Sequence, residues 1–167
     1  SATLGTQYYE GPHGGITTSN SAIVMSANNT YILTISATDS RGFVSSYTYS
    51  FSTLPYSKPS LGTPQIVRND GYGPLTTLTI SGSWSPNLTG IHLAKKITLY
   101  YSSATVSLTS YVLYEDTGNS KTYKPLAGNY NLKNLSFDSD KAYNIYIIAE
   151  DCFGNTATSK TGSLALG

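Results

Sequence analysis

Few residues in this 167-residue chain could carry out acid–base, nucleophilic or metal chemistry. The only histidines are His13 and His92, and the single cysteine is Cys152. A zinc site needs several Cys, His or carboxylate ligands, and the wide spacing of these three residues does not indicate one. A reactive thiol needs a neighbour that favours the thiolate. We therefore interpret Cys152 as a small residue in a turn.

Two aspartates have a spacing that occurs in calcium-binding loops. Asp138 and Asp140 are separated by one residue, but the third ligand and the glycine of such a loop do not follow. The segment between 137 and 143 is better interpreted as a solvated turn before a strand. The sequence therefore predicts no metal site here.

The remaining carboxylates do not form a recognisable catalytic pair. A glycosidase requires two acids that face one another across the sugar. The acids at 115–116 and at 150–151 are adjacent in sequence, and neighbouring side chains on a strand point to opposite faces. A Gly-x-Ser-x-Gly nucleophile motif is also missing. We expect no catalytic, cofactor-binding or metal-binding residue, and no enzyme activity in this chain.

Composition narrows the class of partner. The net charge is +1 and charged residues are 11% of the chain, so no strong field is expected to attract nucleic acid or an anionic membrane. No apolar run approaches the length of a membrane span, and residues 1–15 lack the basic start and apolar core of a secretory signal. A single cysteine allows no internal disulfide, so packing alone must hold each domain together.

Tyrosine, with 15 residues, is the compositional exception. Tyrosine suits the half-buried surface of a strand, and it also makes adaptable contacts at binding surfaces. Residues Tyr8, Tyr9 and Tyr72 fall in or beside expected loops, and Tyr100 falls opposite the apolar face of its strand. These four are the candidate ligand-binding residues, able to stack on sugar rings. The alternative is that they are ordinary scattered surface aromatics.

Other aromatic residues are expected to be structural. Alternation places Trp84 on the buried face of its strand. By the same argument Tyr47, Tyr49 and Phe51 share a face with Phe43 and are expected in a core.

The elements that must position these residues are strands, and one pair of strands occurs twice. The segment from Tyr31 to Phe51 returns as Tyr143 to Leu164, with Asp39 matching Asp151 and Gly42 matching Gly154 at a constant offset of 112 residues. In both copies apolar residues alternate along a strand, and an Asp-x-x-Gly turn leads into a second strand. Each copy is therefore predicted to be a β-hairpin, with a structural role for the turn aspartate.

Five more strands are expected between the two copies, separated by turn signals such as NDGYGP and DTGNS. Their expected ranges are 63–68, 76–85, 95–102, 110–115 and 130–137. With the final hairpin they make seven short strands, the number typical of a β-sandwich. Trp84 near the end of the second strand, and Phe137 six residues before Tyr143, resemble a fibronectin type III domain over residues 63–167.

The chain is thus predicted to be all-β, with tandem immunoglobulin/fibronectin III-like sandwiches. Residues 1–56 form a partial sandwich, residues 57–64 a proline-containing linker, and residues 65–167 a seven-stranded sandwich. The first copy has room only for the last strands of such a unit. It is expected either to be the tail of a domain in a longer chain or to borrow strands from a partner.

Several motifs resemble repeats in minor structural and tail-associated proteins of siphophages that infect Gram-positive bacteria. They are DSRG at 39–42, YSKP at 56–59, RNDG at 68–71 and SGSWSP at 81–86. The resemblance is strongest over residues 30–90, and the second hairpin departs from it with DCFG at 151–154. It implies an extracellular virion component of the phage tail and carries over no catalytic residue.

The leading hypothesis is therefore a tail segment that spaces or presents host-binding parts. Two alternatives remain open: a glycan-binding module that recognises host cell-wall polysaccharide, and an accessory domain of a cell-wall hydrolase. Expected partners are other tail proteins and cell-wall polysaccharide, with homo-oligomerisation left open and no binding to nucleic acid or membrane.

Overall fold

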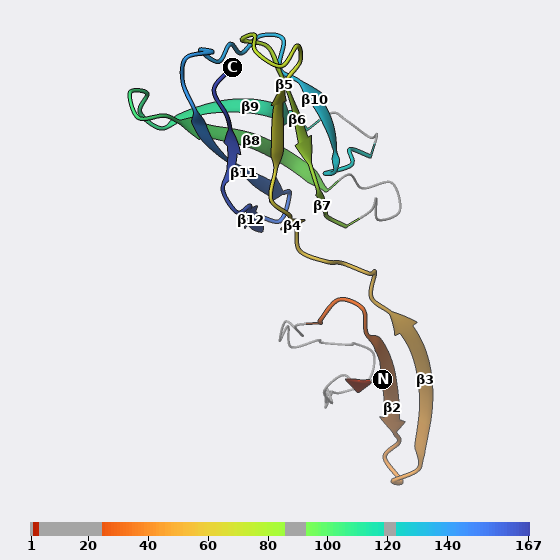
Figure 1. Ribbon diagram of the computed structural model, residues 1–167. Coiled ribbons are helices and arrows are strands. Elements are labelled where there is room, and N and C mark those ends of the chain that lie inside the picture. Colours follow the sequence, from red (N-terminus) through yellow and green to blue (C-terminus); the bar gives the residue numbers. More distant parts are fainter. Residues whose placement is uncertain (1, 4–24, 86–92, 119–122) are drawn as a thin grey trace. The chain divides into compact units, whose positions relative to one another are not determined.

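The computed structural model describes residues 2–3, 25–85, 93–118 and 123–167, and all regular structure in these ranges is β-strand (Figure 1). The predicted all-β class is confirmed. In this part of the chain no helix is long and apolar enough to cross a membrane. The chain divides into two compact units, Ser1–Tyr56 and Ser57–Gly167.

The first unit contains one sheet in the order β1-β2-β3. Strand β1 (Ala2–Thr3) runs parallel to β2 (Thr30–Thr38), and β2 runs antiparallel to β3 (Val44–Ser52). The β2–β3 register is continuous from the Thr30–Ser52 pair to the Thr38–Val44 pair, so the hairpin contains no bulge.

The second unit contains two main sheets, visible in Figure 1. One has the order β10-β6-β5, and the other the order β12-β11-β8-β9, with β13 also paired to β11. The strands of these sheets are β5 (Gln65–Arg68), β6 (Thr76–Ile80), β8 (Ala94–Ser102), β9 (Thr109–Glu115), β10 (Gly128–Asn131), β11 (Tyr143–Asp151), β12 (Thr156–Thr158) and β13 (Gly162–Leu164). A short additional pair joins β4 (Ser60–Leu61) to β7 (Gly82–Ser83).

The core of the second unit lies between its two sheets. Alternate residues of β11 are buried along the whole strand, and Ile145 and Ile147 are fully inaccessible. Residues Leu78 and Ile80 of β6 belong to the same apolar cluster, as does Trp84, whose predicted core position is confirmed by an exposure of 3%. Two antiparallel sheets that enclose one apolar core are consistent with a β-sandwich.

Both hairpins are built with the same local hydrogen bonds. The backbone N–H of Ser26 donates to the Tyr31 hydroxyl over 2.7 Å, and that of Asp138 donates to the Tyr143 hydroxyl over 3.2 Å. This bond from a strand tyrosine to backbone just upstream fixes how the chain enters the strand, as in the tyrosine corner of immunoglobulin-like domains.

The turns of the two hairpins also match. In the first, an Asp39 Oδ1 atom accepts from the N–H groups two and four residues later. In the second, Asp151 Oδ1 does the same. Gly42 and Gly154 have φ angles of 86° and 80°, a region that glycine adopts without strain. The predicted hairpins and the structural role of their aspartates are confirmed.

Three expected strands differ from the observed ones by more than one or two residues at an end. The strand expected over 76–85 splits into β6 and β7, and the second strand of the later hairpin, expected to end at Leu164, splits into β12 and β13. The strand expected over 130–137 ends at Asn131, and Phe137 is fully buried in a loop instead. An apolar residue in a loop can satisfy the core as well as one on a strand, so a burial pattern alone overextends the strand.

The segment 57–64, expected to be a linker, is part of the second unit. Its residues Ser60 and Leu61 form β4, and the Ser57 N–H donates to the Ser85 hydroxyl over 2.6 Å. The prolines of this segment suggested stiffness, but the strand pairing and this hydrogen bond attach it to the sandwich.

Candidate interaction surfaces

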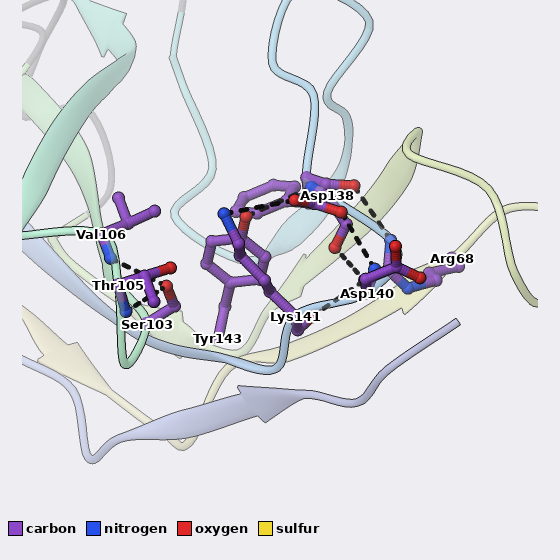
Figure 2. Close-up of polar contacts among 9 residues, drawn as sticks. Arg68, Ser103, Thr105, Val106, Asp138, Asp140, Lys141 and Tyr143 are labelled. Carbon is purple, nitrogen blue, oxygen red and sulfur yellow. Dashed lines mark hydrogen bonds and ion pairs between the residues drawn. The ribbon is translucent and has the colours of Figure 1, made fainter.

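At one end of the second unit, the buried side chain of Arg68 lies beside Asp138 and Lys141 (Figure 2) and contacts three chain segments. Its guanidinium donates five hydrogen bonds of 2.8–3.3 Å, all to backbone carbonyls, those of Gly73, Phe137, Asp138, Lys141 and Ala165. A buried charge is tolerated when its donors are satisfied in this way. Arg68 therefore fastens the β5–β6 turn, the loop before β11 and the end of the chain to one another.

The two aspartates with calcium-loop spacing lie in the loop that Arg68 holds (Figure 2). One oxygen of Asp138 accepts from the Asp140 N–H over 3.0 Å, and the other lies 3.2 Å from Lys141 Nζ. The Asp140 N–H and then Lys141 hold the pKa of Asp138 below its usual range. Both Asp138 oxygens are therefore engaged within an exposed turn that precedes β11. Within the described ranges no three His, Cys, Asp or Glu side chains are grouped to hold a metal.

Tyr72, a predicted ligand-binding residue, stands on the β5–β6 turn. Asp70 shapes this turn by accepting from the Tyr72 and Gly73 N–H groups, and these hydrogen bonds, with that of Gly73 first, lower the pKa of Asp70. The Tyr72 side chain is 69% exposed, so its ring is free to contact a ligand.

Tyr100, another predicted ligand-binding residue, is half-buried rather than exposed. It pairs across the strands with Tyr146, and their rings stack at 4.9 Å with an interplanar angle of 4°. One ring face of Tyr100 is therefore occupied by a protein neighbour. Stacking of cross-strand aromatic pairs stabilises a sheet, so this pair has a structural role whether or not it also binds a ligand.

The other two predicted ligand-binding residues, Tyr8 and Tyr9, lie outside the described residues. Of the four candidates, Tyr72 lies on the turn between β5 and β6, in the sheet β10-β6-β5. Tyr100 lies on β8, in the sheet β12-β11-β8-β9. The structure therefore does not bring these two together into one site.

Cys152 lies exposed in the turn after β11. Partial burial of the thiol, and next the neighbouring Asp151 carboxylate, raise the pKa of Cys152. A raised pKa reduces the thiolate fraction that would react at neutral pH. This agrees with the interpretation of Cys152 as a turn residue.

An exposed apolar surface that the sequence interpretation missed lies on the first hairpin. We define the hairpin face as the side of β2–β3 that carries Tyr31, Leu33, Ile35, Tyr47, Tyr49 and Phe51. Exposure rises along β2 from 7% at Tyr31 to 36% at Leu33 and 56% at Ile35. Tyr47 and Tyr49 on β3 are 65% and 54% exposed. Contiguous exposed apolar surface of this kind marks an interaction site or an aggregation hazard.

The expectation that Tyr47 and Tyr49 are core residues is therefore wrong within this chain. Alternation assigned them correctly to one side of a strand, but it says nothing about whether another layer covers that side. Phe51 is half-buried and lies between the rings of Tyr31 and Tyr49, at centroid distances of 6.1 and 6.2 Å. No local signal distinguishes the exposed face, because the first hairpin has the same apolar alternation as the second.

Comparison with protein-family models and with curated proteins finds no match to this chain.

Proposed function

We propose that this chain is a segment of a phage tail or tail-associated protein, built from repeated immunoglobulin/fibronectin III-like units, that spaces or presents host-binding parts. The observation that carries the proposal is the recurrence of one hairpin design, 112 residues apart, in two units of the same chain. Tandem repetition of a small sandwich extends a protein by a fixed step without adding a catalytic site.

The first and last segments of the second unit are both attached to its sheets, and this supports a mechanical role. Where the chain enters, β4 pairs with β7 and Ser57 hydrogen-bonds to Ser85. In the last described residues of the unit, the Ala165 carbonyl accepts a hydrogen bond from Arg68 and β13 pairs with β11. A spacer transmits load through its entry and exit strands, so attachment at both positions is the feature that such a role requires.

The resemblance of several motifs to repeats of siphophage tail proteins supports the proposed location in a phage tail. Three of them are turns or strand ends in the described residues: DSRG lies between β2 and β3, RNDG begins at the last residue of β5, and the SGSWS part of the last motif contains β7. They describe how the units fold and not what they bind, which favours a structural over a receptor-binding role.

Immunogold electron microscopy of phage particles whose genome encodes this chain tests the proposal. Antibodies raised against residues 57–167 should label the tail of intact virions. Labelling of no virion structure, with the protein present in infected cells, would overturn the proposal of a tail component.

A glycan-binding module is the second candidate, favoured by the 69% exposure of Tyr72 on its ordered turn. Fluorescently labelled 1–167 would be titrated onto Gram-positive cells and purified wall polysaccharide. A spacer predicts no saturable binding. The control variant is Val67→Ala, at an exposed position of β5. Saturable binding that is abolished by Tyr72→Ala and unchanged by Val67→Ala would contradict the spacer proposal and support a glycan-binding module.

A further inference from the structure

Strands β5 and β13, near the beginning and the end of the second unit, lie side by side and point the same way. The two strands contact each other, although they belong to different sheets. A Cβ added at Gly162 would meet the carbonyl oxygen of Pro64. A few residues further along both segments, the Nε atom of Arg68 donates to the Ala165 carbonyl over 3.3 Å. The two segments therefore run parallel.

These two strands connect to opposite ends of the unit. Strand β5 follows β4, and Figure 1 shows β4 at one end of the unit and residue 167 at the other. At that other end, the Gly167 N–H donates to the Ser139 carbonyl over 2.8 Å, and a Cβ added at Gly167 would meet the Tyr72 carbonyl oxygen. A force applied between residues 57 and 167 would therefore pull β5 and β13 in opposite directions along their length.

The Arg68 guanidinium links the two sheets beside these strands. Arg68 is the last residue of β5, in the sheet β10-β6-β5. Its acceptors include the carbonyl of Ala165, directly after β13, and those of Asp138 and Lys141, in the loop before β11. Both β13 and β11 belong to the other sheet. Hydrogen bonds from a charged donor are roughly twice as strong as neutral ones, and they are directional, so they oppose sliding of one sheet along the other.

We propose that these contacts form a shear clamp, which we define as the Arg68 hydrogen bonds together with the parallel, contacting strands β5 and β13. The clamp lets the second unit bear tension between its two ends, and it presupposes the proposed spacer role. Under such tension, the pairing of β5 with β6, the pairing of β13 with β11 and the Arg68 bonds are all loaded along the strands. Bonds loaded in this way must break together, whereas bonds that are peeled from one end break one after another.

Single-molecule force spectroscopy of the 167-residue chain, held through peptide tags fused to both ends, tests the clamp. The second unit contains about twice as many residues as the first, so it gives the longer extension step. Arg68→Gln should lower the unfolding force of that step to about half, because it removes the charged donor.

The matched control is Leu99→Ala, at a fully buried position of β8 that lies outside the clamp. Leu99→Ala should lower the urea midpoint of the second unit as Arg68→Gln does, with a much smaller loss of unfolding force. If the force falls in proportion to the urea stability in both variants, Arg68 stabilises the fold without carrying the load, and the clamp is rejected.

A comparison of pulling directions keeps Arg68 in place and covers the case in which Arg68→Gln does not fold. In a Cys152→Ser background with one cysteine added after Gly167, the second handle is attached at Lys58→Cys or at Tyr72→Cys, both exposed positions. The first pair of handles loads the clamp in shear, and the second pulls apart the adjacent ends of the same segments. The Tyr72 pair should unfold the unit at a clearly lower force than the Lys58 pair.

Equal forces in the two directions, or a higher force for the Tyr72 pair, would overturn the clamp and would leave the proposed tail location to the immunogold experiment. Absence of tail labelling would in turn reject that location without altering either force. The two proposals can therefore fail separately.

Discussion

The hairpin β2–β3 and the hairpin formed by β11 with β12 and β13 share their local chemistry but differ in their surroundings. Each has a strand tyrosine bonded to backbone five residues upstream, and each has an aspartate that accepts two N–H groups in its turn. Yet alternate residues of β11 are buried, while β2 is exposed from Leu33 onward. Turn and entry geometry are therefore encoded within the hairpin, whereas burial is decided by strands elsewhere.

A second difference lies in the returning strand. Strand β3 is continuous, but its counterpart is broken into β12 and β13, and the pairing register with β11 changes by one residue between them. At the break, Ser159 donates its N–H to the Ile147 carbonyl and accepts the Ile147 N–H on its hydroxyl, both over 2.9 Å. An extra residue in one strand bends it locally. The register of the covered hairpin is therefore interrupted, and that of the uncovered one is continuous.

The largest expected effect comes from truncating equivalent residues of the two hairpins. Ile147→Ala should lower the free energy of unfolding of the second unit by about 2–5 kcal/mol, because it leaves a cavity in a filled core. Ile35→Ala removes a side chain that is 56% exposed, and should change stability by less than about 1 kcal/mol. Urea unfolding followed by the fluorescence of Trp84, the single tryptophan, reports the second unit. A shift of the Trp84 midpoint in Ile35→Ala would show that the units are not independent.

The next prediction tests whether the positive φ angle at the turn glycine matters for stability in both hairpins. An added Cβ meets no atom within 4 Å at Gly42 or Gly154, so alanine is opposed only by the positive φ angle. Gly154→Ala should therefore reduce the stability of the second unit by about 1–2 kcal/mol, and Gly154→Asn by less, since asparagine tolerates this conformation. Gly42→Ala should leave the Trp84 transition unchanged. Equal stability of the wild type and Gly154→Ala would contradict the positive φ in the covered hairpin.

Sequence periodicity predicted the parts of this fold that depend on neighbours in the chain. Alternation located both hairpins and the core position of Trp84, and Asp-x-x-Gly located their turns, because each of these signals acts within a few residues. The stack of Tyr100 on Tyr146 depends on a register between strands 46 residues apart, which no local pattern specifies. The five carbonyl acceptors of Arg68 likewise come from separate loops. Exposure of the hairpin face could not be predicted, because alternation identifies a side and not its cover.

A smaller effect is expected from the tyrosine hydroxyls. Tyr143→Phe removes the acceptor of the Asp138 N–H while keeping the buried ring, and should lower the stability of the second unit by about 0.5–1.5 kcal/mol, the usual net value of one hydrogen bond. Tyr31→Phe removes the matching bond to Ser26 and should leave the Trp84 transition unchanged. Amide hydrogen exchange of Ser26 and Asp138 checks both bonds directly. If the exchange rate of the Asp138 amide is the same in Tyr143→Phe and in the wild type, the Tyr143 hydroxyl does not protect this amide. The tyrosine hydrogen bond would then not be a feature that the two hairpins share.

The smallest expected effect concerns the residue two positions after the turn aspartate, which differs between the two hairpins. In the first hairpin this residue is Arg41, which donates to Asp39 Oδ2 from Nε and Nη2 at 3.1 and 2.9 Å, and in the second it is Phe153. The Arg41 side chain, and next the Phe43 N–H, hold the pKa of Asp39 below its usual range. Because the folded pKa is depressed, the stabilisation is present above the unfolded value of about 3.9 and is lost as the pH falls through the lower folded value.

A carboxyl NMR titration of Asp39 should therefore show a midpoint below that of an unstructured aspartate. Arg41→Gln should move it upward toward the usual range, as should 1 M salt, at which the Debye length is only about 3 Å and an exposed pair is screened. Any loss of turn order, followed by the Phe43 amide, should occur at a higher pH in Arg41→Gln than in the wild type. If the midpoint is the same in both proteins, backbone donors alone depress the pKa. The two turns would then be equivalent in chemistry as well as in shape, and the cover over the strands would remain their main difference.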